Sequence, residues 1–100
     1  TGSPLQAVVC NWLYLAQLAH ATRRALPVEE PLWADFYLPA GSVYIDCWDD
    51  EAAPPKLAAR LRNKEVCKAE GLRYLEVNAA DVERLDEVLG RGLLAFGIRC

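Results

Sequence analysis

The chain has 100 residues, of which 53% are hydrophobic, and this length predicts a single domain with a modest core. Its formal net charge of −3 argues against a strong free-standing nucleic-acid binder, because such affinity rests mainly on the neutralisation of phosphates. A membrane span is not expected, since no apolar run approaches the roughly 20 residues that a spanning helix needs.

Thr1–Ser3 is typical of a remnant left by an expression tag, and the chain contains no methionine. We therefore expect residues 4–98 to form one domain of a longer protein. The cysteines are too widely spaced for a zinc site, and their scatter in an apolar chain predicts reduced thiols and a cytoplasmic location. They are Cys10, Cys47, Cys67 and Cys100.

The first predicted element is a heavily buried helix from Pro4 to about Ala21, because apolar residues recur there at helical spacing. His20 lies at the end of this helix and has no partner in the sequence, so we do not expect it to act as a general base. A short strand from Arg23 to Val28 follows, and a turn leads into the next segment.

Two strands around a tight turn come next, Leu32–Leu38 and Val43–Trp48, because large apolar residues alternate there with other residues. Pro39, Gly41 and Ser42 are turn formers, and Gly41 is able to take a positive φ. Residues equidistant from the turn of such a hairpin face each other across the two strands.

Each strand of the hairpin carries one aspartate, Asp35 on the first and Asp46 on the second. Their distances from the turn predict that the two carboxylates converge on one face at the open end of the hairpin. Carboxylates a few Å apart repel each other unless a positive charge lies between them, and Mg²⁺ is a usual partner. The alternative interpretation is that both are solvated residues at strand ends.

A second helix is predicted from about Pro55 to Glu70, where Gly71 ends it, and a strand from Arg73 to Val77 follows. An acidic loop of residues 49–51 precedes this helix.

Asn78 and Asp81 form a capping pair at the start of a last helix, which should run through Leu89 and resume over Arg91–Phe96. The element order is therefore αβββαβα. It predicts an α/β protein with a mixed four-stranded sheet flanked by helices.

The segment ADFYLPAGSVYIDCW, residues 34–48, together with the helix after it, resembles the PD-(D/E)XK nuclease superfamily and its restriction-endonuclease-like fold. More narrowly, it is similar to small bacterial forms that carry Asp-Phe-Tyr-Leu-Pro, a turn, and Val-Tyr-Ile followed by an acid. The resemblance extends from about Pro4 to Ile98.

This resemblance implies that Asp35 and Asp46 bind a catalytic Mg²⁺ or Mn²⁺ and that the domain hydrolyses phosphodiester bonds in DNA, as an endonuclease or an exonuclease. The backbone carbonyl of Cys47 can face the same metal, because oxygen ligands need not be charged. The implied partners are DNA and either a second copy of the chain or the rest of a longer protein, in repair, helicase-linked or mobile-element systems.

The superfamily places a lysine two residues after the second acid, and Trp48 stands there instead. In some members this lysine has moved to the next helix, which here carries a basic stripe at i, i+4 spacing. We predict Lys64 as the catalytic lysine, because it lies beside the apolar side marked by Leu57 and Leu61, with Arg60 as the reserve. The alternative is an ordinary solvated helix face.

On the first helix, Gln6 stands where the superfamily often has another acid, so the site would hold two carboxylates. Two tryptophans flank the hairpin, Trp33 and Trp48, and either can stack on bases, although we expect them to pack on the sheet. Arg23 and Arg24 can touch phosphate or lie as ordinary surface residues.

Three hypotheses therefore stay open. The first is a magnesium-dependent deoxyribonuclease. The second is a nuclease-like domain that has lost catalysis and binds DNA or a protein partner, which the residues at positions 6 and 48 and the acidic pI favour. The third is an unrelated small α/β interaction domain in which the paired aspartates are incidental.

Overall fold

The computed structural model describes residues 4–30, 32–48 and 54–98 of the chain. Its elements are α1 (Pro4–Leu15), β1 (Ala21–Ala25), β2 (Trp33–Leu38), β3 (Val43–Trp48), α2 (Pro54–Glu70), β4 (Arg73–Asn78), the 3₁₀ helix η1 (Ala79–Arg84) and α3 (Leu85–Ala95). The predicted order αβββαβα is confirmed, with η1 as an added turn before α3.

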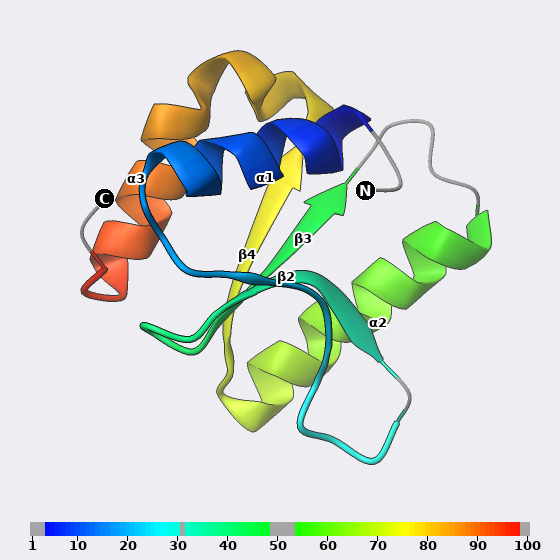
Figure 1. The fold of residues 1–100 in the computed structure, drawn as a ribbon. Coiled ribbons are helices and arrows are strands. Elements are labelled where there is room, and N and C mark those ends of the chain that lie inside the picture. The colour runs from blue at the N-terminus through cyan, green and yellow to red at the C-terminus, as the bar shows by residue number, and fades with distance from the viewer. Residues whose placement is uncertain (1–3, 31, 49–53, 99–100) are drawn as a thin grey trace.

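The four strands form one mixed sheet in the order β1-β2-β3-β4, as the sequence predicts (Figure 1). β1, β2 and β3 pair antiparallel, whereas β3 and β4 pair parallel and are joined by α2. Helices α1 and α3 cover one face of this sheet and α2 covers the other, so the molecule has three layers (Figure 1). No helix in the described ranges is long and apolar enough to cross a membrane.

The larger core lies under α1 and α3. One face of each of these helices is fully or almost fully buried against alternate residues of β2, β3 and β4. Its largest buried members are Phe36, Leu13, Leu38, Ile45, Leu89 and Leu93. A second, smaller cluster lies under α2 and contains Leu26, Ala34, Tyr44, Val66 and Cys67.

The first helix is shorter than predicted, since α1 ends at Leu15 and not near Ala21. Gln17 adopts a left-handed conformation with φ of 59°, and the Leu18 amide donates to the carbonyl of Leu13 at 3.0 Å. This backbone geometry caps the helix without a glycine, so no residue in the sequence marks the end of the helix. The first strand consequently lies at Ala21–Ala25, earlier than the predicted Arg23–Val28.

The hairpin forms where it was predicted, but its turn differs in detail. Ser42, not Gly41, takes the positive φ, at 53°. Gly41 is needed for space instead, because a Cβ there would lie 2.4 Å from Cδ1 of Ile98.

The last helix is continuous and does not break around Gly90. α3 runs through to Ala95 because Leu85, Leu89 and Leu93 form one buried stripe along it. The Asn78 amide donates to Asp81 at 2.9 Å, so the predicted capping pair starts η1 and not the α-helix itself. The predicted acidic loop of residues 49–51, the residues 1–3 and Cys100 lie outside the described residues.

Candidate functional site

The two aspartates converge as the hairpin predicts. β2 and β3 pair Phe36 with Ile45, and the same register continued by one residue sets Asp35 opposite Asp46. The Asp35 amide donates to Oδ1 of Asp46 at 3.0 Å, and the Cys47 amide donates to Oδ2 of Asp35 at 2.8 Å. Each carboxylate therefore bonds the backbone of the other strand at the open end of the hairpin, on the face covered by α2.

An arginine from α2 lies against both carboxylates. Nη2 of Arg60 is 2.9 Å from Oδ2 of Asp35, and its Nη1 is 3.9 Å from Oδ1 of Asp46. Only 5% of the Arg60 side chain is exposed, so its charge is compensated by these acids and not by water. The chain itself thus supplies a positive charge that lies against both carboxylates.

Asp46 is held by two further side chains. Its Oδ2 accepts hydrogen bonds from Nδ2 of Asn63 at 3.0 Å and from the hydroxyl of Tyr74 at 2.9 Å. Asn63 also donates to the carbonyl of Trp33 at 2.8 Å, and the Trp48 indole donates to Tyr74 at 3.1 Å. Asp46 is 0% exposed, and both of its oxygens accept hydrogen bonds.

Burial sets the electrostatics of this cluster. It raises the pKa of the Asp46 carboxyl above its ordinary value, while the hydrogen bonds from Asn63 and from the Asp35 amide oppose that rise. Burial, with the charge of Asp46 nearby, also raises the pKa of the Tyr74 hydroxyl, so Tyr74 remains a proton donor to Asp46. The donors around Asp46 suit an ionised carboxylate, which only accepts.

The Asp35 side chain is more exposed to solvent than that of Asp46. Its Oδ1 accepts a hydrogen bond from Nε2 of Gln6 on α1 at 2.8 Å. A cleft of about 430 Å³ opens beside it, between α1 and strands β1 and β2. The residues that line this cleft are Gln6, Thr22, Arg23, Trp33, Ala34, Asp35 and Phe36.

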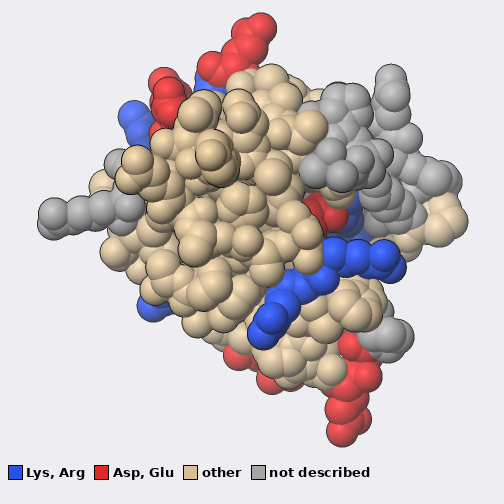
Figure 2. All heavy atoms as spheres, in the orientation of Figure 1, with Lys and Arg blue, Asp and Glu red and all other residues tan. Residues whose placement is uncertain are grey.

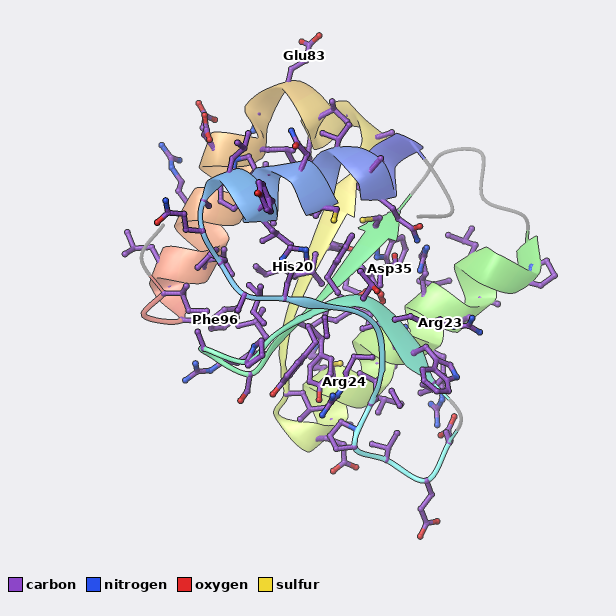
Figure 3. All side chains as sticks on the ribbon, in the orientation of Figure 1. His20, Arg23, Arg24, Asp35, Glu83 and Phe96 are labelled. Carbon is purple, nitrogen blue, oxygen red and sulfur yellow. The ribbon has the colours of Figure 1, made fainter. Side chains whose placement is uncertain are left out.

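The surface around the cleft carries arginines and an aromatic ring. Figure 3 shows Arg23, Arg24 and Asp35 on the face turned to the viewer, and Figure 2 shows an acidic group set into a hollow there with basic side chains beside it. Trp33 is 50% exposed rather than packed on the sheet as expected, and the guanidinium of Arg23 lies 5.6 Å from its ring centre. Trp48 does pack as expected, over Tyr74 and Lys64.

The contacts that the structure gives Lys64 are with Glu76 and Trp48, and its catalytic role stays a prediction. Its ammonium lies 3.1 Å from Oε1 of Glu76 on β4 and 5.7 Å from the ring centre of Trp48 on β3. Cys47 meets the site through its backbone amide, while its side chain is buried in the larger core. The metal-ligand role of the Cys47 carbonyl stays a prediction.

Sequence reasoning named Arg60 only as a reserve and missed Asn63 and Tyr74. Leu57 and Leu61 suggested which side of α2 faces the sheet, yet both are exposed. The inward side carries Arg60, Asn63, Val66 and Cys67. These residues recur at the helical spacing of three and four. Because Arg60 and Asn63 are polar, the sequence pattern suggests a solvated side of the helix and not a buried one.

A divalent cation does not fit the pair in this arrangement. Asp35 and Asp46 already share a guanidinium and accept hydrogen bonds from Gln6, Asn63 and Tyr74. Within residues 4–30, 32–48 and 54–98, no group of three or more histidine, cysteine, aspartate or glutamate side chains could hold a metal ion.

A scan of the chain against protein-family models finds no matching family, and a search of the curated proteins finds no match. We therefore infer the function from the contacts of the site itself.

Proposed function

We propose that the chain is a domain of the restriction-endonuclease-like fold that binds single-stranded DNA without cutting it. The order αβββαβα and the two acids on the β2–β3 hairpin support the fold assignment. The observation that carries the loss of catalysis is the Arg60 guanidinium, which lies against both Asp35 and Asp46.

Arg60 supplies the positive charge that the acid pair requires, and it is part of the folded interior. A metal could reach both carboxylates only if this buried guanidinium left, and an unpaired buried charge costs several kcal/mol. The α2 side chain that donates a hydrogen bond to Asp46 is Asn63, and its amide carries no charge to support an attacking water. Neither the metal nor the lysine of the nuclease mechanism therefore has its usual place.

The cleft beside Asp35 suits a single strand better than a duplex. The exposed ring of Trp33 offers a stacking surface for an unpaired base, and Arg23, which lines the same cleft, offers a positive charge for a phosphate. Arg23, which lines the cleft with Asp35, also has a positive φ of 52°, and strain in a non-glycine residue is frequent at functional sites. The net charge of −3 favours stacking over extensive phosphate contact as the source of affinity.

The test is binding of a fluorescent single-stranded oligonucleotide in the presence of EDTA, followed by anisotropy. Stacking on an aromatic side chain contributes about 1–3 kcal/mol per base, so Trp33→Ala should weaken binding about fivefold or more. Tyr14→Ala is the matched control, because Tyr14 is an exposed aromatic residue on α1 outside the cleft. Absence of binding by the parent, or equal weakening by both variants, contradicts the proposal.

A magnesium-dependent deoxyribonuclease is the second candidate. It is favoured by the convergence of Asp35 and Asp46 from adjacent strands, with Asp35 at a cleft. It requires Arg60 to leave the acid pair when a metal and a substrate bind. Cleavage of single- or double-stranded DNA that needs Mg²⁺ or Mn²⁺ and is lost in Asp46→Asn would establish this candidate and overturn the first.

A further inference from the structure

A thiol and an imidazole meet between α1 and the start of β1, apart from the acid pair. Sγ of Cys10 lies 3.5 Å from Nε2 of His20, and Nδ1 of His20 lies 3.0 Å from the carbonyl oxygen of Leu18. A carbonyl only accepts, so Nδ1 carries the hydrogen and the neutral ring presents the lone pair of Nε2 to the thiol. His20 therefore has the partner that its sequence position did not reveal.

The local fold holds this pair in place. The left-handed Gln17 ends α1 and turns the chain back, so that His20 lies beside the helix that it follows (Figure 3). The imidazole ring makes an edge contact with Phe36, with 5.9 Å between ring centres and 70° between planes. A nucleophile, a base and a group that orients the base thus lie next to one another in space. They are the Cys10 thiol, the His20 imidazole and the Leu18 carbonyl.

Cys10 also has access to small molecules. A shallow pocket of about 350 Å³ lies over it, lined by Ala7, Cys10, Asn11, Tyr14 and His20. The two other cysteines that the structure describes differ in this respect, because Cys47 and Cys67 are at most 1% exposed. Burial raises the pKa of the Cys67 thiol to about 11, which makes that thiol a poor nucleophile.

We infer that Cys10 is a modification site. Its thiol is a nucleophile that reacts with low-molecular-weight disulfides to form a mixed disulfide, and His20 acts as the general base. In the step, Sγ of Cys10 attacks one sulfur of the small disulfide and its proton passes to Nε2 of His20. The new S–S bond forms as the old one breaks, and the departing thiolate takes the proton back from His20. This inference does not depend on DNA binding or on the acid pair.

The test measures the rate at which each cysteine of the full chain reacts with oxidised glutathione, and separately with iodoacetamide, by peptide mass spectrometry. His20→Asn keeps an amide donor for Leu18 but removes the basic nitrogen, and we expect it to slow the reaction of Cys10 about tenfold or more. A thermal melt checks that this variant folds. In the folded parent, Cys10 should react faster than Cys67 and faster than Cys10 itself in concentrated urea.

Equal Cys10 rates in the parent and in a folded His20→Asn variant would overturn the inference. If that variant does not fold, the parent alone decides. A Cys10 that reacts no faster in the folded chain than in the unfolded chain, or no faster than Cys67, is then the overturning result.

Discussion

Phe36 and Asp35 are neighbours on β2, but they point to opposite faces of the sheet and meet different surroundings. Phe36 lies among the leucines, valines and isoleucines beneath α1 and α3. Asp35 faces α2, which buries an arginine and an asparagine against the two acids of the hairpin. The face under α1 and α3 is therefore stabilised by apolar burial, whereas the face under α2 combines a smaller apolar cluster with paired charges and hydrogen bonds.

The difference indicates which parts of the chain serve the fold and which serve something else. An apolar face stabilises by removing surface from water, at roughly 25 cal/mol per Å². A buried ion pair is seldom the most stabilising choice, because hydrophobic residues of similar volume often do as well or better. The buried charges on the α2 face therefore support the proposal that this face is a functional site, with Arg60 as its cation.

The largest effect should come from breaking the paired charges on the α2 face. Arg60→Met leaves Asp35 and Asp46 buried without a counter-charge, and we expect a loss of about 3–5 kcal/mol in the free energy of unfolding. Urea denaturation measures it. Arg62→Met on the exposed side of α2 is the control, and a similar loss in both variants would show that Arg60 has no special role.

A change on the apolar face should cost slightly less. Leu89→Ala removes a fully buried side chain, and we expect it to lower the free energy of unfolding by about 2–5 kcal/mol. Leu94→Ala, on the exposed side of the same helix, serves as the control. If the two variants unfold at the same urea concentration, the packing described for α3 is incorrect.

The two faces should also differ in their response to pH. Burial raises the pKa of Asp46, so the folded chain holds this proton more tightly than the unfolded chain does. Its contribution to stability is complete below the unfolded pKa and is lost as pH rises through the folded pKa. The stability of the parent relative to Asp46→Asn should therefore fall from about pH 4 upward.

Urea denaturation of both proteins at several pH values measures this. The stability of the parent relative to Leu89→Ala provides the reference, because no titrating group is changed there. A difference between the parent and Asp46→Asn that is constant with pH would show that Asp46 does not titrate differently on folding.

The smallest effect is expected at Lys64. Its pair with Glu76 is solvent-exposed, and such pairs contribute about 0.2–1 kcal/mol, so Lys64→Ala should change the urea midpoint only slightly. DNA affinity measured by anisotropy should not change. A strong loss of affinity or of any metal-dependent cleavage would place Lys64 in the site after all.

The sequence predicted the hairpin and its acid pair because strand alternation and the turn residues fix the register independently of the rest of the molecule. It misplaced the end of α1, because Gln17 takes a left-handed conformation that is usually left to glycine. It also chose the wrong inward side of α2. Among the described residues, the charge of Arg60 is compensated by Asp35 and Asp46, which lie far away in the sequence, and pattern alone cannot show that compensation.

The most direct test of the account is a calorimetric titration with Mn²⁺, in the presence of a single-stranded oligonucleotide, of the parent and of Asp46→Asn. The oligonucleotide supplies the phosphates that many nuclease metal sites need. If Arg60 serves as the cation of this site, the two proteins should give the same heats. A binding event in the parent that disappears in Asp46→Asn would contradict the account and place a metal between the two aspartates.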